Sequence, residues 1–370
     1  MASKILQSEP EVRRPKDRYQ MFPENRLNFA KIIIMKVRRH KLLFFPGIAG
    51  ALLIVFCSSW GFLVHRAVGQ LAIYQLPKPM RAFFWLNRDS VVSQSIRPDI
   101  RRNTDRTEAP RHFIDLEAYG DSAAWKMPMT MTEAIRQFTL DTLHKYGYVP
   151  YVVLEVKDRL TEAFRKGDRD SILFYAIDLG HYIGDANVPL HSSINYDGQL
   201  TGQRGLHALW ESTVPDQLMD GYKLRDGHKA RYLSDPAASI WESVRRAHGL
   251  LQQMFEEERQ ASAGIPDSVK YRVEHRYGRD IKVYTPAFAK IYGARLGSMV
   301  NDQLLHSADQ IADFWYTAWV DAGKPELNAL LPAPLTRKDK RAMCVESKDY
   351  RKGRLIEKQL LLSRKYPGWE

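Results

Sequence analysis

Two histidines in one short stretch of the chain are each followed four positions later by a carboxylate. The pairs are His181 with Asp185 and His207 with Glu211, and His191 lies between them. Residues four apart on a helix share a face, so each pair can close on one ion. A surface ion pair explains a single such pair at least as often. Two pairs around a third histidine indicate a metal site, and they require these segments to converge in the fold.

The residues from about 60 to 325 predict helices. Apolar residues recur every three or four positions in six segments, 62–76, 130–143, 152–167, 170–185, 237–260 and 287–323. Thr130 and Glu133 predict an N-cap at the start of the second segment. Pro189 should end the helix that carries His181, which leaves His191 on the next turn, where it can fold back. No alternating run of strand length competes, so the predicted class is all-α with a single multi-helix domain.

The N-terminal segment has the pattern of a secretory signal peptide. A basic stretch at 36–41 precedes an apolar run at 42–56, and small residues follow before Trp60. The run is shorter than the roughly 20 residues of a bilayer span. We therefore expect residues 1–59 to be an extension plus signal peptide, and the protein to be exported, to a periplasm or the outside. An uncleaved membrane anchor through 42–56 is the alternative.

Composition adds weaker constraints. Hydrophobic residues make up 44% and charged residues 26% of the chain, which argues against wholesale disorder. The net charge of +12 favours anionic partners, such as phosphate groups, nucleic acid or membrane surfaces, without identifying one. Residues 326–370 are basic and polar, and we expect a solvated tail or a short terminal helix there. The two cysteines, Cys57 and Cys344, lie outside the predicted domain, so it has no internal disulfide.

The ligand types point to particular metals. Imidazole and carboxylate groups without thiols suit Zn²⁺, and Mn²⁺ or Fe²⁺ would also fit. The chain has no glycine-rich phosphate loop and no internal repeat.

The order of the motifs resembles that of the superfamily of zinc-dependent phospholipases C and single-strand-specific nucleases. That family has His-x-x-x-Asp, a histidine six residues later, and then His-x-x-x-Glu or His-x-x-x-Asp, as found here from His181 to Glu211. The resemblance covers about residues 60–325. It implies an all-helical, exported enzyme that is built around three zinc ions and hydrolyses phosphate esters.

Six more positions match the family. Its mature chain begins with a tryptophan whose amine and carbonyl bind zinc, and Trp60 follows the expected cleavage site, five residues before His65. The family's His-Phe-x-Asp sequence corresponds to His112, Phe113 and Asp115. A family aspartate precedes that histidine by about 14 residues. Asp99 precedes His112 by 13 residues, whereas the competing Asp105 precedes it by only seven, so we choose Asp99.

The resemblance implies nine metal ligands on three zinc ions, with Asp185 shared by two of them. The first zinc would be bound by Asp99, His112, His181 and Asp185; the second by Trp60, His65 and Asp185; and the third by His191, His207 and Glu211. Two close cations lower the pKa of a shared water and hold a phosphate, and the third stabilises charge on its oxygens. Asp99 is also expected to orient the attacking water, so Asp99 and Asp185 are the predicted catalytic residues.

The substrate is a phospholipid or a nucleic acid. The chain lacks the Gly-Gly-Asn loop of the nuclease branch, and the 16-residue gap from His191 to His207 is nearer the phospholipase spacing. Phe113 and Asp115 resemble the nuclease pair that holds a base, although Phe113 can equally pack beside the metals. We favour a phospholipase C-like phosphodiesterase, with a nuclease as the alternative and a non-catalytic zinc-binding envelope protein as a third reading. Contact with a membrane surface is compatible with the basic charge, and no obligate protein partner is evident.

Overall fold

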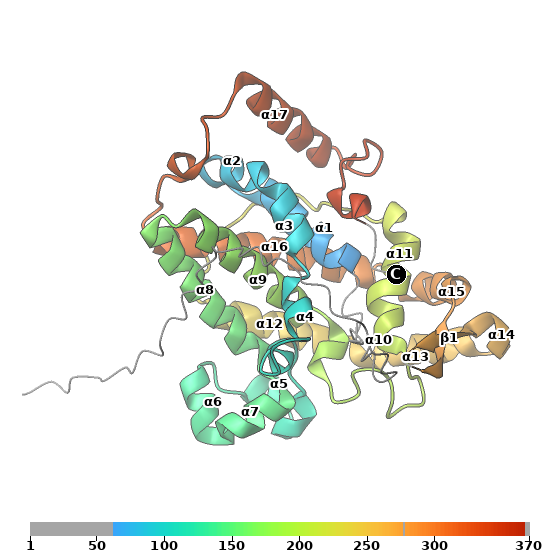
Figure 1. Cartoon of the computed structure of the whole chain (residues 1–370). Coiled ribbons are helices and arrows are strands. Elements are labelled where there is room, and N and C mark those ends of the chain that lie inside the picture. The colour runs from blue at the N-terminus through green and yellow to red at the C-terminus, as the bar shows by residue number, and fades with distance from the viewer. Residues whose placement is uncertain (1–61, 277, 367–370) are drawn as a thin grey trace, which may run out of the picture. The chain divides into compact units, whose positions relative to one another are not determined.

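The computed structural model describes residues 62–276 and 278–366, which are mostly helical (Figure 1). The longer helices are α1 (Phe62–Gln75), α2 (Lys78–Leu86), α6 (Met131–Phe138), α8 (Val149–Lys166), α9 (Arg169–Ala186), α12 (Pro236–Gly249), α13 (Leu251–Ser262), α15 (Pro286–Leu296), α16 (Met299–Asp321) and α17 (Arg337–Arg351). The shorter ones are α3 (Arg88–Gln94), α4 (Arg97–Arg101), α5 (Ala123–Lys126), α7 (Leu140–Tyr146), α10 (Leu206–Ala208), α11 (Val214–Leu218) and α14 (Asp267–Lys270). The described residues are mostly helical, which is consistent with the predicted all-α class.

The structure differs from the sequence prediction in how the long helical segments are divided. Segment 130–143 breaks at Thr139, which has a φ of 68°, and segment 287–323 breaks at Gly297. Segment 237–260 divides at Leu250. The predicted N-cap is confirmed, because Thr130 Oγ1 accepts a hydrogen bond from the Glu133 amide. Apolar periodicity continues through these breaks, so it predicts the helices but not their ends.

One antiparallel hairpin was missed. Strands β1 (Tyr271–Arg276) and β2 (Arg279–Tyr284) pair with Tyr271 opposite Tyr284, and they form the one sheet in the described residues. Val273 in β1 is 64% exposed, so the hairpin lacks the alternation of buried and exposed positions that marks a half-buried strand.

Helices α8 and α9 form a tight hairpin at the centre of the fold. Gly167 takes a left-handed conformation that ends α8, and Asp168 accepts hydrogen bonds from the next amides to begin α9. Helix α16 packs on α1, α8 and α9. Trp315 of α16 donates its indole N–H to the Ala176 carbonyl and stacks on Phe84. This packing buries α9 continuously from Ala176 to Ala186, so every charged group on that stretch must find a partner inside the protein.

The C-terminal segment is not a free tail in its described part. Helix α17 begins with a capping box at Thr336 and Asp339, and its exposed face is basic. The chain then returns to α1, where Leu361 and Leu362 are buried. The fully buried Gln70 of α1 donates to the Leu360 carbonyl and accepts from the Leu362 amide, each at 2.8 Å.

The predicted signal segment and Trp60 lie outside the described residues. Among residues 62–276 and 278–366, no helix combines the length and the apolar character that a membrane span requires.

Replacing Gln70 with alanine should destabilise the protein by about 2–4 kcal/mol, because two buried backbone groups at 360 and 362 would lose their partner. Gln137→Ala, at an exposed position of α6, is the matched control and should change stability by less than about 0.5 kcal/mol. Chemical denaturation of both variants measures this. Equal stability would mean that the C-terminal segment is not held by Gln70.

Candidate metal centre

Helix α9 brings two predicted ligands to the centre of the fold. His181 is 1% exposed and Asp185 is 0% exposed, and they lie one helical turn apart. His181 Nε2 is 3.3 Å from Asp185 Oδ2. As Pro189 predicted, α9 ends at Ala186, and the following 3-10 turn, Pro189–Ser192, carries His191 back toward Asp185.

The four residues expected around the first metal converge. Asp185 Oδ2 lies 2.9 Å from His112 Nδ1, and Asp99 Oδ1 lies 3.6 Å from the same nitrogen. His181 Nε2 is 3.1 Å from His112 Nδ1 and 3.7 Å from Asp99 Oδ1. Two atoms that bind one tetrahedral zinc at roughly 2.0–2.1 Å lie about 3.3–3.4 Å apart. These pairwise distances suit ligands of one ion, and Asp99, His112 and His181 are close enough together to hold one.

The other oxygen of Asp185 points toward a second group. Asp185 Oδ1 is 3.4 Å from Nε2 of His65, which α1 carries, and both side chains are fully buried. His65, His181 and Asp185 together are also close enough to hold an ion. The carboxylate of Asp185 is thus placed between two sets of nitrogen donors, the arrangement that a bridging ligand requires.

The third group comes from the second pair and the intervening histidine. Glu211 Oε1 is 3.1 Å from His191 Nε2, and Glu211 Oε2 is 2.9 Å from His207 Nε2. The two Nε2 atoms lie 3.3 Å apart. Helix α10 continues into a π-helical turn, Leu209–Thr213, and this turn carries Glu211. Single π-turns within helices are frequent at functional sites.

Backbone carbonyls orient three of the rings so that Nε2 faces the cluster. The Nδ1 contacts are His181 to Ser95 O at 2.8 Å, His191 to His112 O at 2.6 Å and His207 to Tyr196 O at 3.0 Å. With the proton on Nδ1, each ring keeps a lone pair on Nε2. Metal-binding histidines are usually held in this way by their second nitrogen.

The buried carboxylates provide a test of whether a cation fits. Asp99, Asp185 and Glu211 are each at most 8% exposed. Within the described residues, both oxygens of Asp99 and of Glu211, and Oδ1 of Asp185, have no hydrogen-bond donor. A buried carboxylate without a donor is costly unless a cation lies beside it. The donor set therefore fits metal ions.

The pKa values of His181 and Glu211 reflect the attraction between the buried carboxylates and the histidines. Burial alone lowers the pKa of His181, but Asp185 and Asp99 raise it to about 9. Burial likewise opposes the charged form of Glu211, but His207 and His191 hold its pKa at about 2. Glu211 and Asp185 likewise raise the pKa of His191 to about 9 against the effect of burial, so protons on His181 and His191 balance the carboxylates, and a bound metal would displace them.

A carboxylate that the sequence analysis missed lies behind the cluster. Glu108 is 3% exposed, and its Oε1 lies 3.3 Å from His112 Nε2, the nitrogen that faces away from Asp185. Arg101 Nε donates to Glu108 Oε2 at 2.9 Å, and Tyr182 donates its hydroxyl proton to Oε1. Burial opposes the charge on Glu108, yet contacts with His112, Arg101 and Tyr182 lower its pKa well below the usual range.

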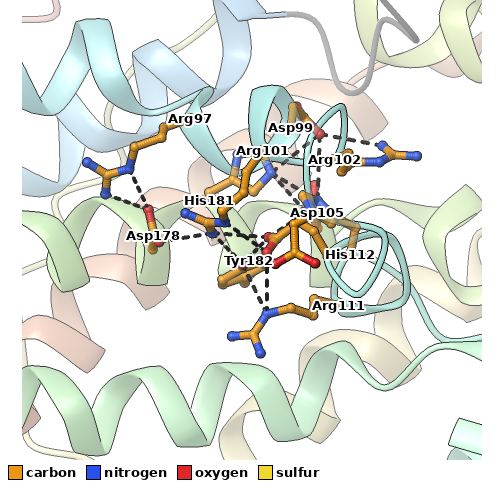
Figure 2. A network of polar contacts seen from close by, with 12 residues as sticks. Arg97, Asp99, Arg101, Arg102, Asp105, Arg111, His112, Asp178, His181 and Tyr182 are labelled. Atoms are coloured by element: carbon orange, nitrogen blue, oxygen red, sulfur yellow. Dashed lines mark hydrogen bonds and ion pairs between the residues drawn. The ribbon is translucent and has the colours of Figure 1, made fainter. Parts of the chain in front are cut away.

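Figure 2 shows how this network continues away from the metal ligands. Arg101 also donates to Asp178 on α9, which accepts a 2.6 Å hydrogen bond from Arg97. Arg111 donates to the Tyr182 hydroxyl at 3.2 Å. One signal was available in the sequence: Glu108 precedes His112 by four residues, the same spacing as in the two ligand pairs read in reverse.

The two predicted substrate residues line a cavity of about 500 Å³ beside the cluster. Its walls are Arg102, His112, Phe113, Asp115, Leu190, His191, Tyr196, Asp197, His207 and Ala208. Gly147, with a φ of 79°, approaches Phe113 so closely that a Cβ atom there would lie 2.3 Å from the Phe113 carbonyl oxygen. Burial, and then Glu117, raise the pKa of Asp115 to about 7. Arg102, Tyr196 and Asp197 were not predicted.

Asp105, the competitor of Asp99, belongs to the network of Figure 2 but to none of the three groups of candidate ligands. Its Oδ1 accepts hydrogen bonds from the amide and the hydroxyl of Thr107 in a local turn. Asp99, on α4, faces the histidines. Comparison of the chain with models of known protein families and with characterised proteins found no match.

Asp185→Asn should reduce bound metal more than Glu211→Gln does. The first change removes the charge of a carboxylate whose two oxygens face different donor groups, whereas Glu211 faces only His191 and His207. We expect a loss of more than one equivalent in Asp185→Asn and at most one in Glu211→Gln. Elemental analysis of the purified variants beside wild type measures this, and equal losses would contradict a shared Asp185.

Glu108→Gln should weaken metal binding by about 10- to 100-fold, because the amide no longer holds His112 with a full negative charge. Competition with a chelating dye measures the affinity. Glu155→Gln is the matched control, since Glu155 is partly exposed and pairs with Arg111 and Arg159 rather than with a candidate ligand. Unchanged affinity in Glu108→Gln would limit Glu108 to a structural role.

Proposed function

We propose that this protein is a zinc-dependent phosphodiesterase of the phospholipase C type. The observation that carries the proposal is the set of buried carboxylate oxygens without hydrogen-bond donors, on Asp99, Asp185 and Glu211, near histidine nitrogens and beside a cavity of about 500 Å³. Nitrogen and oxygen donors without a thiol are compatible with Zn²⁺. Bound there, zinc ions would acidify a water and neutralise the charge of a phosphate.

The chain's own residues would complete the reaction. Asp185 would set the separation of two of the three ions through its two oxygens. Asp99 lies at the edge of the cluster, where its carboxylate can accept a hydrogen bond from the attacking water. Arg102, which lines the cavity and lies 3.6 Å from Asp99, adds positive charge for a phosphate oxygen.

The cavity walls favour a phospholipid. Phe113, Leu190 and Ala208 are apolar and lie beside the histidines, so they can cover the carbon skeleton next to a phosphate. A nuclease is the second candidate, because Phe113 could stack on a base and Asp115 could accept its hydrogen bonds. Asp115 with a pKa of about 7 would then be an acceptor mainly above neutral pH.

The test is hydrolysis by purified, zinc-loaded protein of phosphatidylcholine, single-stranded DNA, RNA and a small soluble diester, bis(p-nitrophenyl) phosphate. We expect the soluble diester and phosphatidylcholine to be cleaved, and a chelator to stop both reactions. Preference for the nucleic acids would support the nuclease, and no hydrolysis of any substrate would refute the enzyme.

Asp99→Asn should lower hydrolysis of the soluble diester by about 100-fold or more, since it removes a buried ligand charge. Asp105→Asn is the matched control, six residues away and turned toward Thr107, and should retain near wild-type activity. Equal loss in the two variants would mean that Asp99 has no special role.

A further inference from the structure

The loop of residues 193–205 joins the turn after α9 to α10. Unlike an ordinary surface loop, it exposes its large apolar side chains and buries several polar ones. All three of its large apolar side chains are exposed: Ile194 at 40%, Tyr196 at 54% and Leu200 at 67%. Three of its polar side chains are buried: Ser193 at 2%, Asn195 at 8% and Gln203 at 4%. Exposed apolar side chains that lie close together mark interaction surfaces, and these three fall within seven consecutive residues.

Internal hydrogen bonds hold the loop in this conformation. Asn195 Oδ1 accepts from the Leu200 amide at 2.8 Å, and Gln199 Nε2 donates to the Ile194 carbonyl at 2.7 Å. Gly198 has a φ of 70°, and a Cβ atom there would lie 2.5 Å from the Gln203 carbonyl oxygen. The buried polar groups therefore fix the backbone so that the apolar side chains point outward, which lowers the entropy lost on binding.

The loop lies between two of the candidate ligands, with His191 just before it and His207 just after it. Glu117 accepts hydrogen bonds from the Ser193 hydroxyl and the Ile194 amide, at 2.6 and 3.0 Å. The Tyr196 carbonyl accepts the Nδ1 proton of His207, and Tyr196 itself lines the cavity. The exposed apolar side chains thus belong to the segment that forms one wall of the cavity.

We propose that the loop 193–205 is a membrane-docking element that places Ile194, Tyr196 and Leu200 in the apolar boundary of a phospholipid surface. This rests on the proposed function, and it specifies that the substrate is taken from a lipid surface. In a phospholipid only the glycerol separates the phosphate from the acyl chains. A phosphate at the histidines therefore brings the acyl chains to the mouth of the cavity that Tyr196 lines, in the same loop as Ile194 and Leu200.

Charge argues against a nucleic acid as the occupant of this loop. Sites for single strands combine basic residues with several aromatic side chains. Residues 193–205 contain one arginine, Arg204, and one aromatic residue, Tyr196. A nucleic acid would leave Ile194 and Leu200 uncovered, whereas a lipid surface covers both.

The test compares two double variants of the full chain for binding to vesicles. Ile194→Ser with Leu200→Ser removes the proposed contacts. Ile135→Ser with Leu140→Ser is the matched control, since Ile135 and Leu140 are 38% and 42% exposed and lie on α6 and α7. Vesicles of a non-hydrolysable phosphonate analogue of phosphatidylcholine separate binding from turnover. Their zwitterionic surface minimises the effect of the +12 net charge, and both variants carry the same N-terminal segment.

We expect the loop variant to lose about tenfold or more in vesicle partitioning and the control to remain within about twofold, because two aliphatic side chains no longer leave water. Leu200→Trp, at the most exposed position of the loop, should increase partitioning, and it tests the proposal even if the double variant folds poorly. Equal binding by wild type, loop variant and control would overturn the proposal. So would a loss of binding to single-stranded DNA with vesicle binding intact.

Hydrolysis of the soluble diester distinguishes this inference from the proposed function. The loop variant should retain that activity, since Ile194 and Leu200 do not line the cavity. Vesicle binding that depends on the loop, without hydrolysis of the diester, would refute the proposed enzymatic function and leave the docking proposal standing. Metal-dependent hydrolysis with loop-independent vesicle binding would refute only the docking element.

Discussion

The buried carboxylate of Asp185 is the constraint on which the centre of this structure depends. It is fully inaccessible to solvent and belongs to a helix that is covered on all sides from Ala176 to Ala186. An isolated carboxylate in such a place would cost several kcal/mol. Histidines from three other segments surround it, at distances of 2.9–3.6 Å. The packing of α1, the segment at 112 and the turn at 191 is thus arranged around one negative charge.

Successive polar partners extend this arrangement outward. The carbonyl oxygen of His112 accepts a hydrogen bond from His191 Nδ1, and the amide of Ile114 donates one to the His191 carbonyl at 2.8 Å. The segments that carry His112 and His191 are thus joined by hydrogen bonds in both directions. Behind His112, Glu108 is compensated by Arg101, whose other partner, Asp178, is compensated by Arg97 at the half-exposed edge. Charge therefore alternates from the buried centre to solvent. Such alternation lets ligands be fixed rigidly without leaving an unpaired charge inside the fold.

The clustering of the candidate ligands was predictable from the sequence where the relevant geometry is local. His181 with Asp185 and His207 with Glu211 depend only on the helical repeat, and Pro189 dictated the turn that brings His191 back. Asp99 could be predicted only from its distance along the sequence to His112, which matches the spacing in the family that the chain resembles. The spacing of four between Glu108 and His112 hints at a contact, but which ring nitrogen of His112 faces Glu108 is a consequence of tertiary packing. The hairpin at 271–284 and the helix break at Thr139 arise from exposed or left-handed positions, to which apolar periodicity is insensitive.

The hydrogen bonds between Gln70 and residues 360 and 362 join positions about 290 residues apart. During synthesis the chain emerges from its first residue onward, so α1 exists long before its C-terminal partner has been made. Until then α1, which carries His65, lacks both the hydrogen bonds of Gln70 to residues 360 and 362 and the packing of Leu361 and Leu362. Contacts between residues this far apart in the sequence carry a loop-closure entropy that local contacts do not. The packing around α1 is therefore completed only after residues 360 to 362 have been made.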